Sequence, residues 1–333
     1  MQFLLSGNNN LSGKFPYWLR NSSKLVFLDL GVNKFYGTLP AWIGELVNLR
    51  FLQLNHNMFM GDIPVNITKL VLLQHFSLAS NNISGSIPSS LSKLTAMTIE
   101  HPPRLDPQWY SFDGDTNTEI LSVVMKQQEL KYGTFAANEM VGVDLSLNHL
   151  TGGIPDDICS LNGLLNLNLS WNHLTGKIPV KIGDMKSLES LDLSRNNLFG
   201  EIPTTLSDLT FLSSFDLSYN NLEGTIPTGR QLDTIYNENP SVYSGNIGLC
   251  GPPLEKSCPG NDAPEHPNQQ QGSENGYNTV LFFYFGLTAG FVTGLWVVFC
   301  ALLFHRAWRN AISDSSTSYM IMCTCLLLLL GKV

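Results

Sequence analysis

Apolar and polar positions alternate along this chain with a fixed period. One pattern, L-x-x-L-x-L-x-x-N-x-[LF]-x-G-x-[IL]-P, describes "LVFLDLGVNKFYGTLP" (25–40), "LRFLQLNHNMFMGDIP" (49–64), "LLNLNLSWNHLTGKIP" (164–179) and "LESLDLSRNNLFGEIP" (188–203). Its asparagine recurs every 24 residues in two groups, at Asn9, Asn33, Asn57 and Asn81 and then at Asn148, Asn172, Asn196 and Asn220. Such self-similarity predicts a solenoid, in which each repeat buries its apolar face against its neighbours.

Each position of the repeat has a physical role in that prediction. The L-x-L alternation is typical of a short strand, with Leu52 and Leu54 pointing inward and Gln53 on the open face. The recurring asparagine is expected to hydrogen-bond backbone groups that the tight turn leaves unpaired. Glycine accepts the turn geometry, and proline fixes φ where the chain bends away. We therefore interpret these positions as structural, and none of the asparagines as catalytic.

The period breaks once, between the two groups of repeats. From Asn81 to Asn148 the step is 67 residues, which is one repeat plus 43 extra residues. Residues 95–139 lack the repeat pattern but contain "ILSVVMKQQELKY", which alternates as a strand does. They also carry Trp109, Tyr110 and further aromatic residues, more than a disordered segment usually has. We interpret this segment as a functional insertion, with a plain linker as the alternative.

A second kind of apolar pattern lies near the C-terminus. Residues 278–304 contain no charged side chain over 27 positions, which is about 40 Å of helix and enough to cross a bilayer. The polar residues 259–277 before them are interpreted as an extended linker. Basic residues follow the apolar run and acidic ones precede it, so the positive-inside rule places the repeats outside the cell and residues 305–333 in the cytosol.

Within this predicted transmembrane helix, Gly286, Gly290 and Gly294 recur every fourth residue and fall on nearly one helix face. No hydrophobic force brings helices together in lipid, so a strip of small residues that permits close approach is a common packing device. We interpret the strip as an interface for the membrane span of a partner. The alternative is that glycine is simply frequent in membrane helices.

Residues 305–333 are too few for a kinase domain, so we expect signalling to require a catalytic partner. The apolar run at 319–331 is also too short to span a membrane, and its role stays open. We find no P-loop, G-x-G-x-x-G, H-E-x-x-H or G-x-S-x-G arrangement and predict no enzyme, no cofactor and no metal site. The histidines fall singly, and His56 and His75 are interpreted as surface residues.

Composition and charge narrow the location. The net charge of −8 argues against nucleic acid as a partner. Five N-x-[ST] sequons make Asn10, Asn21, Asn66, Asn82 and Asn168 glycosylation candidates, and they favour a secretory route. The N-terminus "MQFLLSGNNN" lacks the features of a signal peptide, so we expect the sequence to be a fragment or to have a misassigned start.

The L-x-G-x-I-P signature with its 24-residue period resembles the plant extracellular leucine-rich repeat. The chain is similar to the C-terminal part of a kinase-lacking plant receptor-like protein of the Cf/EIX-receptor type. The resemblance implies an α/β-type leucine-rich-repeat solenoid with a parallel concave sheet, formed by repeats at 1–94 and 140–230 around an island at 95–139. It also implies a cap at 231–258 in which Cys250 and Cys258 form a disulfide. A zinc site at these two cysteines is not predicted, because two further ligands are lacking.

The resemblance further implies a single-pass receptor in the plasma membrane. Such a receptor binds an extracellular peptide, protein or glycan, associates with an adaptor receptor kinase and a co-receptor kinase, and acts in defence. Trp171, Arg195 and Tyr219 rank first as ligand-binding candidates because they lie on three adjacent repeats and belong to types enriched at hot spots, and the island residues Trp109 and Tyr110 rank next. The other strand positions that we expect to be exposed are Arg50, Gln53, His56, His75, Ser77, Asn166, Asp192 and Asp216.

Two alternatives remain open. One is a binding or inhibitory protein that captures, for example, a microbial wall-degrading enzyme without signalling. Deletion of residues 278–304 would distinguish it, because a soluble ectodomain would then perform the whole function. The other is a truncated, non-functional receptor fragment, which would be retained or degraded rather than reach the plasma membrane as a glycoprotein.

Overall fold

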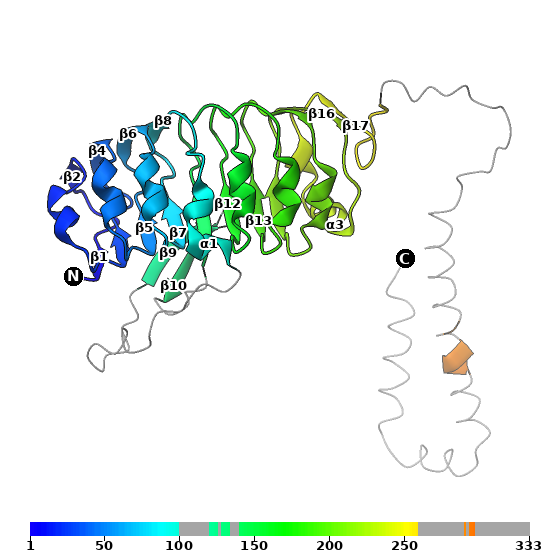
Figure 1. Cartoon of the computed structure of the whole chain (residues 1–333). Coiled ribbons are helices and arrows are strands. Elements are labelled where there is room, and N and C mark those ends of the chain that lie inside the picture. The colour runs from blue at the N-terminus through cyan, green and yellow to red at the C-terminus, as the bar shows by residue number, and fades with distance from the viewer. Residues whose placement is uncertain (100–119, 126–127, 134–139, 259–289, 291–292, 297–333) are drawn as a thin grey trace, which may run out of the picture. The chain divides into compact units, whose positions relative to one another are not determined.

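The computed structural model describes residues 1–99, 120–125, 128–133, 140–258, 290 and 293–296. Residues 1–263 form one compact unit, in which the repeats stack side by side (Figure 1). Of the second unit, residues 264–333, only the short helical pieces at 290 and 293–296 are described. Among the described residues, no helix is both long and apolar enough to cross a membrane.

The repeats build one parallel sheet of eight strands, called the main sheet here. Its strands, in spatial order, are β1 (Phe3–Leu5), β3 (Phe27–Asp29), β5 (Phe51–Gln53), β7 (His75–Ser77), β11 (Gly142–Asp144), β12 (Asn166–Asn168), β13 (Ser190–Asp192) and β15 (Ser214–Asp216). Equivalent residues of successive repeats lie side by side, as Leu28, Leu52 and Phe76 do. The predicted solenoid with a parallel sheet is confirmed.

The leucines of the repeat form a continuous core behind this sheet. In the third repeat Leu49, Leu52 and Leu54 are fully buried, and the equivalent Leu73, Phe76 and Leu78 of the next repeat join the same cluster. Burying each such side chain contributes about 1.5–3 kcal/mol, and no repeat could gain this without its neighbours.

Short 3-10 helices return the chain from one strand to the next. They are η1 (Tyr17–Asn21), η2 (Ala41–Glu45), η3 (Val65–Lys69), η4 (Leu91–Lys93), η6 (Asp156–Ser160), η7 (Val180–Asp184) and η8 (Thr204–Asp208). Six of the seven follow directly on the proline of the repeat, as η2 follows Pro40 and η7 follows Pro179. Proline lacks an N–H and has a fixed φ, so it is well suited to the residue before a helical turn.

The repeated asparagine ties each repeat to the one before it. The Asn57 amide nitrogen donates to the carbonyl oxygens of Leu54, Asn55 and, one repeat earlier, Leu30, at 3.1, 3.2 and 2.9 Å. Its Oδ1 accepts a hydrogen bond from the Phe35 N–H at 2.9 Å. The same set of bonds recurs along the stack and forms an asparagine ladder, which satisfies buried backbone groups as predicted.

The ladder and the main sheet both continue across the insertion. Strand β11 pairs directly with β7, with Gly142 beside His75. The Asn148 amide nitrogen donates to the Leu78 carbonyl, and its Oδ1 accepts from the Ile83 N–H, both at 2.9 Å. The insertion therefore leaves the stack without interrupting its register.

The described parts of the insertion are α1 (Thr95–Thr98) and an antiparallel hairpin of β9 (Ile120–Met125) and β10 (Gln128–Gly133). The alternating segment predicted as strand thus forms two paired strands rather than one. Trp109 and Tyr110 lie outside the described residues.

Two lateral sheets, one of four strands and one of three, lie next to the main sheet. The four-stranded one contains β2 (Ser12–Gly13), β4 (Lys34–Thr38), β6 (Met58–Asp62) and β8 (Asn82–Ser84), and the three-stranded one contains β14 (Phe199–Glu201), β16 (Asn221–Thr225) and β17 (Gly248–Cys250). Except for β17, which lies beyond the last repeat, these strands come from the L-x-G-x-I-P part of the repeat. Their residues alternate between the core and solvent, with Phe35 and Phe59 stacked inward at 6.3 Å.

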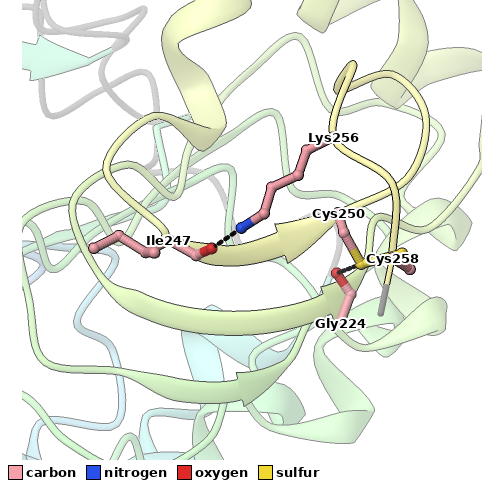
Figure 2. Close-up of a disulfide and its surroundings, with 5 residues drawn as sticks. All are labelled: Gly224, Ile247, Cys250, Lys256 and Cys258. Carbon is pink, nitrogen blue, oxygen red and sulfur yellow. Dashed lines mark hydrogen bonds between the residues drawn. A yellow bond between two sulfur atoms is a disulfide. The ribbon is translucent and has the colours of Figure 1, made fainter. Parts of the chain in front are cut away.

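A cap closes the C-terminal end of the stack. It contains α3 (Arg230–Glu238), η9 (Pro240–Tyr243) and β17, and Cys250 is joined to Cys258 by a disulfide (Figure 2). The Lys256 ammonium donates to the Ile247 carbonyl across the same loop. Asn246 extends the ladder into the cap, because its amide nitrogen donates to Leu217 at 2.9 Å and its Oδ1 accepts from the Leu222 N–H at 3.1 Å.

We expect Asn148→Ala to be strongly destabilising, because it leaves three carbonyl oxygens and the Ile83 N–H without their partner inside the core. The free energy of unfolding should fall by about 3 kcal/mol, measured by urea-induced unfolding. The matched control is Asn197→Ala at an exposed position outside the ladder, which should change it by less than about 0.5 kcal/mol. Equal effects of the two substitutions would contradict the role of the ladder.

Candidate ligand-binding surface

Two rows of side chains on the main sheet point away from the core. The first position of each strand contributes Phe3, Phe27, Phe51, His75, Gly142, Asn166, Ser190 and Ser214, and the third contributes Leu5, Asp29, Gln53, Ser77, Asp144, Asn168, Asp192 and Asp216. The first row is aromatic before the insertion and consists of small or polar residues after it. The two halves of this face therefore differ in chemistry.

The aromatic half is a stack of rings. The ring centroid of Phe27 lies 5.0 Å from that of Phe3 and 4.3 Å from that of Phe51, and the Phe27 and Phe51 rings are nearly parallel. The His75 ring follows, with its centroid 6.2 Å from that of Phe51. Phe27 is only 1% exposed, and these phenylalanines form an apolar cluster separate from the core.

Several residues expected to be exposed on this face are buried instead. Gln53, His75, Ser77 and Asn166 are all buried, so the interpretation of His75 as a surface residue was wrong. Neighbouring strands are only about 4.8 Å apart, so large side chains in one row cover each other. The His75 ring also leans over Gly142, where a Cβ would come within 3.3 Å of its Nδ1. Burial lowers the pKa of His75 to about 4, so its imidazole is neutral at physiological pH.

The three first-ranked candidates lie together. The Arg195 guanidinium sits between two rings, 4.2 Å from the centroid of Trp171 and 4.1 Å from that of Tyr219. The two rings are 51% and 50% exposed. Each cation–π contact contributes about 0.5–1 kcal/mol at an exposed site. We call this stack of three side chains the ridge.

The backbone holds the ridge in place. Trp171, Arg195 and Tyr219 each precede a ladder asparagine and each has a φ of 54°, the left-handed conformation that most residues avoid. Their backbone N–H groups donate to the carbonyl oxygens of Ser194, Ser218 and Ser244 in the following turn, at 3.0, 2.8 and 2.7 Å. These bonds bridge neighbouring turns, so the three side chains project from fixed points.

The cap supports the outer end of the ridge. Gly245 packs against Tyr219, because a Cβ at position 245 would lie 2.7 Å from the ring atom Cδ1. Tyr219 is therefore held between Arg195 and the cap.

Carboxylates line the main sheet beside the ridge. Asp192 and Asp216 are half-buried, and Oδ1 of each accepts a hydrogen bond from the backbone N–H two residues later, in Ser194 and Ser218. Burial raises the pKa of Asp216, whereas the nearby Arg195 charge opposes that rise. The ridge therefore combines one cation and two aromatic rings with an acidic border.

Asp144 is the most deeply buried of these carboxylates. Its Oδ1 accepts from the Ser146 N–H at 3.0 Å and the Ser146 hydroxyl at 2.7 Å. Burial raises its pKa to about 6, and the Asp192 charge adds to the rise. Asn168, the equivalent residue of the next repeat, accepts the same two bonds from Ser170 at 3.1 and 2.7 Å.

Two histidines that the sequence analysis treated as single residues are a pair. The exposed rings of His149 and His173 stack at 5.7 Å on adjacent repeats. Their spacing of 24 residues is the signal that could have revealed the pair. Within the described ranges, no three His, Cys, Asp or Glu side chains gather into a group that could hold a metal. Cys159 is buried, and burial raises the pKa of its thiol to about 11.

The remaining candidates are spread over the molecule. Asn10, Asn21 and Asn82 are exposed, whereas the amides of Asn66 and Asn168 are half-buried and hydrogen-bonded. Gly290 and Gly294 have open space where a Cβ would lie, and Gly286 lies outside the described residues.

We expect Asp144→Asn to stabilise the fold at neutral pH, because the amide keeps the Ser146 contacts and removes a buried charge. The raised pKa means that the folded state binds a proton that the unfolded state has lost, so wild-type stability falls as pH rises from about 4 through about 6. The variant should be more stable by about 2 kcal/mol at pH 7.5 and nearly equal at pH 4, measured by urea unfolding. Asp192→Asn, at a less buried position, should show a smaller gain. A loss of stability at pH 7.5 in Asp144→Asn would contradict this account.

Comparison with known proteins agrees with this geometry. The Leucine Rich Repeat family matches residues 48–70, 72–94, 141–161, 163–185, 187–209 and 211–229. Receptor-like protein EIX2 of Solanum lycopersicum is 40% identical over 75 residues, 21% of this chain and 7% of the relative. Receptor like protein 21 of Arabidopsis thaliana is 36% identical over 85 residues, 25% of this chain and 8% of the relative. The matched parts thus span less than a tenth of these curated relatives.

Solved ectodomains have the same fold. The leucine-rich-repeat ectodomain of the Arabidopsis thaliana membrane receptor kinase GASSHO1/SCHENGEN3, in complex with CASPARIAN STRIP INTEGRITY FACTOR 2, matches with a TM-score of 0.58 and 33% identity over 75% of this chain and 24% of its own. The Arabidopsis receptor kinase HAESA ectodomain, in complex with an IDA peptide hormone, matches with a TM-score of 0.57 and 33% identity over 76% of this chain and 34% of its own. The 24-residue repeats, the parallel solenoid and these relatives make the chain similar to the plant leucine-rich-repeat receptor-like proteins.

Proposed function

We propose that this chain is a cell-surface receptor that binds an extracellular peptide through the ridge of Trp171, Arg195 and Tyr219. The observation that carries the proposal is the stack itself, in which two half-exposed rings and a guanidinium are fixed on adjacent repeats. Trp, Tyr and Arg are the side chains that dominate binding energy at interfaces. Similarity to ectodomains that bind peptides, such as HAESA with its IDA hormone, favours a peptide over a glycan.

The geometry indicates which contacts a ligand would make. The faces of the Trp171 and Tyr219 rings that point toward Arg195 are already occupied, so a ligand would cover their exposed parts and the outer N–H groups of the guanidinium. Because the side chains are held before binding, little entropy is lost in ordering them. The acidic border formed by Asp192 and Asp216 disfavours ligands with several negative charges.

We further propose that the receptor spans the plasma membrane once through residues 278–304, with the repeats outside the cell. The 27-residue uncharged run supports this, as do the basic residues after it. The strip of Gly286, Gly290 and Gly294 would contact the span of an adaptor receptor kinase, and a co-receptor kinase would join after ligand binding. Neighbours that include HAESA with both its peptide and SERK1 support a co-receptor. The resemblance to receptors of the Cf/EIX type favours a role in defence.

The ligand site can be tested with peptides selected on the full chain. Members of a random peptide library that bind the chain in lipid nanodiscs would be measured by calorimetry against variants. We expect Arg195→Ala to weaken their binding by about tenfold or more, since it removes the cation and loosens both rings. Lys186→Ala is the matched control, because this exposed cation makes long contacts with Asp208, an ion pair at 3.9 Å and a hydrogen bond to its carbonyl oxygen at 3.5 Å. Unchanged binding in Arg195→Ala, or a library without binders, would contradict the proposal.

The partner interface can be tested by filling the glycine strip. Replacing Gly286, Gly290 and Gly294 together by isoleucine should abolish co-precipitation of the adaptor kinase from membranes, because the branched side chains keep the helices apart. Thr288→Ile, predicted to lie on the opposite helix face, is the control and should leave the association intact. Recovery of the kinase at the wild-type level with the triple variant would refute the interface.

A further inference from the structure

The four-stranded lateral sheet carries an exposed apolar strip made of Tyr36, Met58 and Met60. These side chains are 46%, 46% and 48% exposed. Tyr36 and Met58 are register partners on β4 and β6, and Met60 follows Met58 on the same face of β6. Exposed apolar groups gathered on one sheet face generally have a partner that covers them or a role in binding.

Two sequons lie at the two sides of this strip. Asn82 is in β8 and is the register partner of Met60. Asn10 lies two residues before β2. Strand β2 pairs with β4 on the side of β4 that faces away from β6. Asn10, Met58 and Asn82 each follow a ladder asparagine, so they occupy the same position in their repeats. Both sequon asparagines are exposed.

The other sequons differ in their surroundings. The Asn66 amide nitrogen, where a glycan would be attached, donates to the Ala41 carbonyl at 2.9 Å. Asn168 lies on the main sheet, where its Oδ1 accepts a bond from the Ser170 hydroxyl. Asn21 is exposed but belongs to η1, in the part of the repeat that returns the chain to the next strand. Of the five, Asn82 is exposed on the four-stranded lateral sheet itself, and Asn10 is exposed two residues before β2 of that sheet.

We propose that N-linked glycans on Asn10 and Asn82 cover the apolar strip. The anomeric carbon of a lipid-linked oligosaccharide forms a bond to Nδ2, which loses one proton as the lipid pyrophosphate leaves. A bulky hydrophilic glycan that begins beside Met60 can place the C–H faces of its first sugars over the methionine and tyrosine side chains and present hydroxyl groups to water. This inference rests on the extracellular location of the proposed function, because the transfer takes place in the secretory pathway.

The test uses the full chain produced in plant cells. Glycopeptide mass spectrometry should find Asn10 and Asn82 occupied in the wild-type protein. In Asn10→Gln/Asn82→Gln, binding of a dye specific for apolar surfaces should rise at least about twofold and self-association should appear in sedimentation. Asn21→Gln is the matched control and should leave both readouts unchanged. Adding Met58→Thr and Met60→Thr to the double variant should restore the wild-type values.

Each outcome decides a different question. Occupancy at Asn21 with bare Asn10 and Asn82 would overturn the inference alone, whereas five bare sequons would also contradict the proposed extracellular location. Occupied sites whose removal changes neither readout would show that the glycans do not cover the strip. If the double variant is not produced, Ser12→Ala/Ser84→Ala removes the same sequons, and endoglycosidase treatment of the folded wild-type chain supplies the same comparison.

Discussion

The fold depends on the buried asparagine ladder. Each ladder amide binds carbonyl groups of its own turn and of the preceding repeat, as Asn57 does with Leu54 and Leu30. Because a buried backbone group without a partner is costly, the offset between repeats cannot change without breaking several bonds at once. The ladder explains how the chain can hold a 43-residue insertion: extra residues are tolerated wherever they leave Asn148 in contact with Leu78.

This constant offset determines the chemistry of the surface. Residues at the same position of successive repeats are held side by side. Two similar side chains at that position therefore stack because of the repeat spacing alone. Phe27 and Phe51 stack in this way, and Arg195 lies between Trp171 and Tyr219 for the same reason. The left-handed turn before each ladder asparagine is the point from which the ridge projects, so the interaction that holds the core also positions the candidate site.

The periodic features could be predicted from sequence, because they repeat at a fixed spacing. The strands, the roles of the ladder asparagines and the proximity of the ridge residues all follow from the 24-residue step. The pairing of His149 with His173 follows from it too, and was missed because the histidines were considered one at a time. Asn246 escaped notice because the last step, from Asn220, is 26 residues rather than 24.

The burial of side chains on the face of the main sheet that points away from the core could not be predicted in the same way. Strand alternation tells which way Gln53, His75 and Asn166 point, but their exposure depends on what lies above them and on how neighbours in the row pack. The stack on Phe51 and the missing side chain of Gly142 together bury His75, and neither effect can be read from a single repeat. Alternation likewise predicted strand structure in the insertion but not its division into two paired antiparallel strands.

The cap supports the candidate site in addition to closing the end of the core. Tyr243 of the cap packs against Phe215 beneath the main sheet, while Gly245, two residues later, packs against Tyr219 of the ridge. Asn246 then fixes the same turn to Leu217, and the Cys250–Cys258 disulfide closes the chain just beyond it. The ring at the end of the ridge is thus supported by residues that also end the core. Because Tyr219 in turn supports Arg195, the geometry that a ligand meets depends on the closed end of the solenoid as much as on the repeats that carry the ridge.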